Sequence, residues 1–143
     1  MNAGVGYFNV DHLINQACHL GILNNADNVY NRIKSHNLLE EAFRTNPNYQ
    51  LLVTGHSLGA GTAVILALKL KSEYPNIKCI AFSPPGGLIS QHLAEYTRSF
   101  VMSVVIGDDI VPRLSVHTVH NLKADILKVN SFKMFINDKF FSP

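Results

Sequence analysis

The sequence predicts an α/β fold with a mostly parallel sheet, and three observations lead to this prediction. Short apolar segments of strand length alternate along the chain with longer segments of helical pattern. Of the 143 residues, 47% are hydrophobic and 15% charged, which suits one modest domain with a buried core. A Gly-x-Ser-x-Gly motif, Gly55–Gly59, lies between one such strand and one such helix. Because strands that alternate with helices pair in parallel, we expect a sheet covered by helices.

The first part of the chain is expected to be a loop followed by a helix. Gly4 and Gly6 suggest a loop, and residues 12–14 suggest a short helical turn. A single helix is then predicted, capped by Asn24 or Asn25 and ended by Asn46-Pro47-Asn48. Its apolar stripe consists of Val29, Ile33, Leu38, Leu39 and Phe43.

The remaining segments continue the alternation of strand and helix. Buried strands are predicted over residues 49–54, 77–82 and 100–106, because these runs are apolar and bounded by turn residues. Helices are predicted over residues 60–71, 90–98 and 116–129, with turns at 72–76 and 83–87. Residues 132–143 have no clear period.

The Gly-x-Ser-x-Gly motif has the strand–turn–helix context of a nucleophile elbow. Such a turn strains the backbone of Ser57 and points its hydroxyl out of the sheet. We expect Gly55 and Gly59 to be glycine because a side chain there would meet the neighbouring strand or helix. The amide of Leu58 opens the helix and could stabilise an oxyanion. The alternative is a glycine-rich turn whose serine only caps the helix.

A serine nucleophile needs a histidine to accept its proton and a carboxylate to orient that histidine. In elbow hydrolases the acid follows the serine, on a later strand. Asp109 comes directly after the strand predicted at 100–106, with Asp108 as its rival, and Pro112 fixes the turn beyond. The carboxyl ends of parallel strands share one edge, and Ser57, Ser83–Pro85 and Gly107–Asp109 all fall at such ends.

No histidine is a good candidate for the base. His117 and His120 follow Asp109, but they lie only 8 and 11 residues beyond it, on a predicted helix, where an exposed helix face is the better explanation. His56 must point away from Ser57, and we expect it to be a structural residue or part of the pocket wall. The other histidines, His12, His19, His36 and His92, have no catalytic context.

Composition excludes several classes of function. The net charge is +2 with scattered basic residues, which argues against a nucleic-acid surface. Cys18 and Cys79 provide no disulfide framework, and Cys79 is expected to be an inert core residue. We find no secretory signal and no apolar run long enough to span a bilayer. No carboxylate cluster has the spacing of a calcium loop, so no metal site is predicted.

Beyond the elbow, several longer stretches resemble the class 3 (fungal-type) lipases, and most closely the sn-1-specific diacylglycerol lipases. The resemblance covers about residues 18–130. It is carried by Val53–Ala63, Tyr74–Cys79, Phe82–Leu88 and Val104–Arg113, and by the His19-x-Gly21 segment. The Ser-Pro-Pro-Gly-Gly and Asp-Ile-Val-Pro-Arg pieces make it more specific than the elbow alone.

The resemblance implies a partial α/β-hydrolase fold in which Ser57 is the nucleophile, Asp109 the acid and Leu58 an oxyanion donor. Pro84 and Pro85 would join His56 at the substrate. The family's reaction removes the sn-1 acyl chain of diacylglycerol, giving a 2-monoacylglycerol and a fatty acid, with no cofactor for the chemistry. The resemblance also implies a plasma-membrane location, a membrane surface as partner and an association with calcium.

The chain also departs from the family pattern. The family's histidine follows a long insertion that is not found here, and its second oxyanion donor and its spanning helices lie upstream of residue 1. Elbow folds usually have six or more strands, whereas about three are predicted. We therefore expect one partial lipase domain over residues 1–143, with a divergent tail at 131–143 and negligible activity alone. The alternative function is a truncated, catalytically incomplete fragment acting as a non-enzymatic or lipid-binding module.

Overall fold

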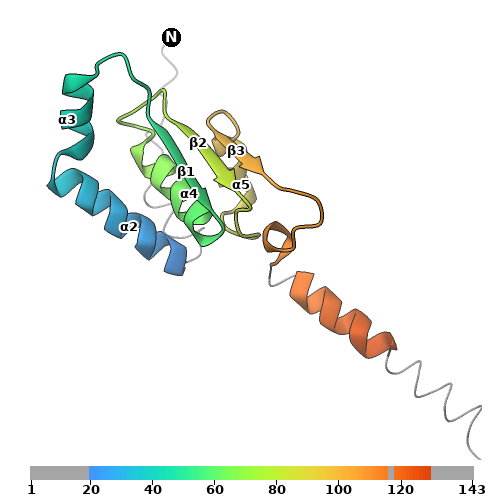
Figure 1. Cartoon of the computed structure of the whole chain (residues 1–143). Coiled ribbons are helices and arrows are strands. Elements are labelled where there is room, and N and C mark those ends of the chain that lie inside the picture. The colour runs from blue at the N-terminus through green and yellow to red at the C-terminus, as the bar shows by residue number, and fades with distance from the viewer. Residues whose placement is uncertain (1–19, 116–117, 130–143) are drawn as a thin grey trace, which may run out of the picture.

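A computed structural model describes residues 20–115 and 118–129 (Figure 1). The expected loop at Gly4 and Gly6, the turn at residues 12–14 and the tail at 131–143 lie outside these ranges. The elements in chain order are α2 (Leu20–Ser35), α3 (Leu38–Thr45), β1 (Leu52–His56), α4 (Leu58–Leu70), β2 (Lys78–Phe82), α5 (Gln91–Thr97), β3 (Val101–Val104) and the 3-10 turn η1 (Val111–Arg113). Residues 118–129 form a further helix.

The three strands form a parallel sheet in the order β1-β2-β3, which confirms the predicted fold class. β1 is shifted towards the C-terminus relative to its expected range, whereas β2 and β3 are shorter than expected. Differences of this size are usual at the ends of strands. His56 lies opposite Phe82, and Phe82 lies opposite Val104. The carboxyl ends of all three strands are therefore level, and the segments that follow them emerge at one edge.

Helix α4 forms the centre of the core. Nine of its thirteen residues are buried, because it packs on β1 and β2 on one side and on α2 on the other. At Gly61 an added Cβ would lie 3.1 Å from side-chain atoms of both Ile22 and Leu88, so glycine allows the two helices to pack closely. A helix that is apolar on every side is expected in such a sandwiched position.

The single helix predicted before β1 is wrong: two helices, α2 and α3, occupy this region. They are separated at Asn37, which has φ 50° and ψ 36°, a left-handed conformation that asparagine tolerates better than most residues. The N-cap assignment is also wrong. Asn24 and Asn25 lie inside α2, whose buried side chains are Ile22, Leu23 and Ala26.

The helix at residues 118–129 extends away from the sheet and its helices (Figure 1). All twelve of its residues are exposed. In the two ranges that the structure describes, no helix is long and apolar enough to cross a membrane.

Candidate active site

Ser57 occupies a sharp turn between β1 and α4, as the motif predicts. Its backbone has φ 54° and ψ −123°, a strained conformation for a residue with a side chain. The turn is held by the Ser57 N–H, which donates to the Phe82 carbonyl at 2.9 Å, and by the Ser57 carbonyl, which accepts from the Ala60 N–H at 2.9 Å. The Ser57 side chain makes no capping hydrogen bond to α4. The alternative of a capping serine is therefore wrong.

The two glycines of the motif serve different purposes. At Gly55 an added Cβ would lie 2.2 Å from the Gly59 carbonyl oxygen and 2.9 Å from the Ala60 nitrogen, so the expected steric need is confirmed. At Gly59 an added Cβ would meet nothing within 4 Å, so the same expectation is wrong there. The strand can therefore turn directly into α4 only because residue 55 has no side chain.

Asp109 lies at the same edge of the sheet, where Ser83 holds its carboxylate. Ser83 is the first residue after β2, its N–H donates to the Val104 carbonyl at 2.8 Å, and its φ of 50° is also left-handed. The Ser83 hydroxyl is the largest cause of a lowered pKa at Asp109, because its hydrogen bond favours the charged carboxylate. The Val111 N–H adds a second hydrogen bond, to Asp109 Oδ1 at 3.0 Å.

Positive charges lower the pKa of Asp109 further, with Arg113 contributing more than His56. Arg113 also fixes the backbone of the loop, because its guanidinium donates to the carbonyls of Asp109 and, at 3.0 Å, of Gly107. Asp109 is half-buried and accepts the Val111 N–H, whereas Asp108 is exposed. These contacts favour Asp109 over Asp108 as the organised carboxylate.

The loop after β2 and the loop after β3 are locked together through Gly86. The Gly86 N–H donates to the Val111 carbonyl at 3.1 Å. An added Cβ at Gly86 would lie 2.3 Å from the Leu114 carbonyl oxygen and 2.5 Å from that of Pro112. The tight fit keeps Ser83 and Asp109 in a fixed relation, although 26 residues separate them in the chain.

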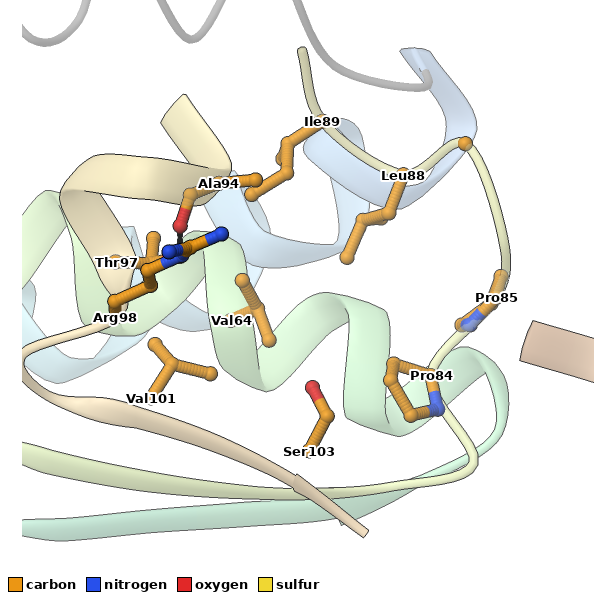
Figure 2. Close-up of a pocket in the computed structure, with 11 residues that line it drawn as sticks. Val64, Pro84, Pro85, Leu88, Ile89, Ala94, Thr97, Arg98, Val101 and Ser103 are labelled. Carbon is orange, nitrogen blue, oxygen red and sulfur yellow. Dashed lines mark hydrogen bonds between the residues drawn. The ribbon is translucent and has the colours of Figure 1, made fainter. Parts of the chain in front are cut away.

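Pro84 and Pro85 line a cavity of about 330 Å³ between α4, α5 and β3 (Figure 2). Arg98 lies at the end of the cavity opposite the prolines in this view. His56, which was grouped with the prolines, does not line it. The apolar side chains of the wall are Val64, Pro84, Pro85, Leu88, Ile89, Ala94 and Val101.

The described histidines have different surroundings. His36 Nδ1 lies 2.9 Å from the Ser35 hydroxyl and 3.0 Å from the Arg32 carbonyl, at the end of α2. His120 lies on the exposed helix, and His117 falls outside the described residues. His56 is the one described histidine whose charge acts on Asp109. Within the described ranges, no group of three metal-binding side chains occurs.

The sequence places Ser83 at the end of a predicted strand, but it assigns no role to Ser83 or to Arg113. Each acts on Asp109 through contacts that no periodicity reveals, and Ser83 reaches it from another strand. One feature of the sequence could have indicated a role for Ser83: it directly follows β2, just as Ser57 directly follows β1.

Comparison with known proteins places these features in context. The sequence profile "Lipase (class 3)" matches residues 3–119. Diacylglycerol lipase-beta of Mus musculus is 46% identical over 111 residues, which cover 78% of this chain and 17% of that protein. Diacylglycerol lipase-alpha of Homo sapiens is 40% identical over 116 residues, 78% of this chain and 11% of that protein. The chain thus spans less than a fifth of these relatives.

Solved structures of fungal lipases share the fold. Lipase II from Rhizopus niveus has a TM-score of 0.60 at 26% identity, over 71% of this chain and 40% of that one. The N225Q mutant of MDLA from Penicillium cyclopium has a TM-score of 0.55 at 30% identity, over 63% of this chain and 35% of that one. A structure described as a triacylglycerol lipase with a serine protease triad has a TM-score of 0.58 at 27% identity, over 71% of this chain and 40% of that one.

Proposed function

The chain belongs to the class 3 lipase family, and we propose that it carries the nucleophile and the acid of a serine ester hydrolase. The observation that carries the proposal is the pairing of Ser57 at a strained strand-to-helix turn with a hydrogen-bonded Asp109 carboxylate at the same sheet edge. Strain of this kind persists only where the surrounding structure imposes it, and it concentrates at functional sites.

In the proposed reaction Ser57 Oγ attacks the acyl carbonyl while a histidine accepts its proton. The amide of Leu58, at the start of α4, donates to the oxyanion, assisted by the helix dipole. The histidine then protonates the leaving alcohol, and water releases the fatty acid from Ser57. Asp109 orients the imidazole and stabilises its charged form, for which its lowered pKa is suitable because the carboxylate stays ionised at neutral pH.

We propose diacylglycerol as the substrate and its sn-1 ester as the bond that is cleaved. Two diacylglycerol lipases match 78% of the chain, which supports this choice over other acyl esters. The proposed products are a 2-monoacylglycerol and a fatty acid, with Pro84 and Pro85 near the acyl chains. A membrane surface as the source of the substrate is part of the proposal. Calcium is suggested by the family resemblance alone, since the described residues contain no group of three metal-binding side chains.

None of the described histidines is assigned as the base that accepts the proton of Ser57. The experiment therefore supplies this base as free imidazole. The purified chain is mixed with a nitrophenyl butyrate ester, with and without imidazole, and hydrolysis is followed by absorbance. We expect negligible hydrolysis alone and a rate with imidazole that exceeds the rate of imidazole without protein. Ser57→Ala should abolish the excess, and Asp109→Asn should reduce it. The matched control, Asp108→Asn, should leave it unchanged.

A fluorophosphonate probe gives a second, covalent readout. Mass spectrometry should find the phosphonate on Ser57, more slowly in Asp109→Asn than in Asp108→Asn. An excess rate or label that persists in Ser57→Ala contradicts the proposal. A folded chain with neither rate nor label supports the alternative, a catalytically incomplete lipase-like module.

A further inference from the structure

The cavity between α4, α5 and β3 extends along β3 from one edge of the sheet towards the other. Pro84 and Pro85 line it at the carboxyl edge, where the candidate active site lies. Arg98 is the C-cap of α5 and lies at the opposite end, just before β3 begins (Figure 2). Val101 and Ser103 of β3 line the stretch between the two ends. The cavity therefore leads from the candidate active site to a cation.

The guanidinium of Arg98 is free to bind an anion. Within the described ranges it has no hydrogen-bond or ion-pair partner. Two other cations nearby in the sequence are occupied: the Arg113 guanidinium donates to two backbone carbonyls, and Lys78 Nζ donates to the Ser99 carbonyl at 3.1 Å. A guanidinium presents a planar fork of donors that matches the two oxygens of a carboxylate. A carboxylate is therefore the partner that suits Arg98.

The wall between the prolines and Arg98 suits an apolar chain. Val64, Leu88 and Ile89 contribute branched apolar side chains to it. The Thr97 hydroxyl is already satisfied, because it donates to the Ala94 carbonyl at 2.8 Å. The volume of about 330 Å³ is at the small end of the range for small-molecule sites. A ligand with one apolar chain of medium length and one anionic end matches this combination.

We propose that the cavity binds a medium-chain fatty acid, with its carboxylate on Arg98 and its tail towards Pro84 and Pro85. The proposal rests on the proposed function for the origin of the acid, which water releases from Ser57. Diacylglycerol is neutral and offers no partner for the guanidinium, whereas the released acid does. In this orientation the carboxylate lies at the end away from Ser57. The acid then occupies the place of an acyl chain and slows further turnover.

A second cavity also borders Arg98, but it lies at the other edge of the sheet. It has a volume of about 450 Å³ and is lined by the first residue of each strand, Leu52, Lys78 and Val101. The amino ends of these parallel strands lie opposite the edge that carries Ser57. This cavity does not connect the reaction to Arg98, so an acid bound there would contradict the proposal.

The first experiment measures the binding of decanoate to the purified chain by isothermal titration calorimetry, below the concentration at which micelles form. Octanoate should bind about tenfold more weakly, because two methylene groups leave the apolar wall. Arg98→Gln should weaken decanoate binding about fivefold, since an exposed ion pair contributes modestly, and should leave the binding of neutral 1-decanol unchanged. The matched control, Arg44→Gln on α3, should change neither affinity.

Two comparisons separate this proposal from the catalytic one. Ser103→Phe fills the cavity from β3 and should abolish binding of both decanoate and 1-decanol, with far-UV circular dichroism showing a retained fold. Ser57 does not line the cavity, so Ser57→Ala should bind decanoate as the wild type does. A wild-type chain that reacts with fluorophosphonate but does not bind decanoate contradicts this proposal alone. A chain that binds decanoate but does not react contradicts the proposed function alone.

Photolabelling then locates the bound acid, even if Ser103→Phe fails to fold. A decanoic acid with a diazirine at its terminal carbon should label the segment 84–89, as found by mass spectrometry, and decanoate should compete. Label at Leu52 or Met102 places the acid in the second cavity and overturns the proposal. Decanoate affinity that is unchanged in Arg98→Gln overturns it as well.

Discussion

The turns after β1 and β2 are built alike but use their serines differently. Ser57 and Ser83 each follow a strand, each has a left-handed φ, and each donates its N–H to the last carbonyl of the next strand. Ser57 leads directly into α4, and its side chain makes no bond to that helix. Ser83 leads into a proline–glycine loop, and its hydroxyl binds Asp109.

The difference shows that backbone strain alone does not identify a nucleophile. In both turns the sheet and the adjoining segment impose the conformation, and the neighbours decide what the hydroxyl does. After β1, Gly55 packs against Gly59, and the Ser57 hydroxyl makes no capping hydrogen bond to α4. After β2 the packing of Gly86 against Leu114 brings a carboxylate to the hydroxyl.

The largest effect is expected where the first turn is tightest. Gly55→Ala places a methyl group 2.2 Å from the Gly59 carbonyl oxygen, which is backbone and can move only with α4. We expect a loss of at least about 3 kcal/mol in the free energy of unfolding, measured by urea denaturation. The Ser57 turn should not survive in such a chain.

The paired variant Gly59→Ala separates this clash from general glycine effects. An added Cβ there meets nothing within 4 Å, and alanine favours helix, so the change should stabilise the chain by up to about 1 kcal/mol. Equal destabilisation by both substitutions would show that the turn does not depend on the contact at Gly55.

The second turn should be weakened most by Gly86→Ala. The new methyl group would lie 2.3 Å from the Leu114 carbonyl oxygen, so the two loops must separate, at a cost of about 2–3 kcal/mol. Gly87→Ala is the control, because its Cβ would meet Ser115 at an ordinary 3.5 Å and only its φ of 65° is unfavourable, at about 1 kcal/mol. Urea denaturation of both variants should show this order, and the reverse order would contradict the proposed lock between the loops.

The first turn was predictable from the sequence, whereas the second was only partly so. Gly55–Gly59 between an apolar run and an alanine-rich segment indicates the strand, turn and helix, because each signal is local. The hydrogen bond from Ser83 to Asp109 joins residues 26 positions apart and has no period. The break at Asn37 was missed because the apolar stripe continues across it, while the left-handed conformation at Asn37 ends α2.

Replacement of each serine by glycine sharpens the comparison. Glycine removes the cost of a left-handed φ, so Ser57→Gly should stabilise the chain by about 1 kcal/mol while abolishing the label at residue 57. Ser83→Gly relieves similar strain but also loses the bond to Asp109, so its net gain should be smaller. Thermal unfolding of both variants tests this, and a larger gain at Ser83 would mean that its hydroxyl contributes nothing to the fold.

The smallest effect concerns the proton equilibrium of Asp109. The Ser83 hydroxyl is the largest cause of its lowered pKa, so Ser83→Ala should raise that pKa towards its ordinary value. A carboxyl whose pKa is lower in the folded state stabilises the fold at pH values above its unfolded pKa. That contribution is lost as the pH falls through the folded pKa, so Ser83→Ala should make the acid-side loss of stability shallower.

Carbon-13 NMR of the Asp109 carboxyl in an Asp108→Asn background measures the shift directly, with Ser103→Ala as the control. An unchanged Asp109 pKa in Ser83→Ala would mean that the two turns are joined by their backbones alone.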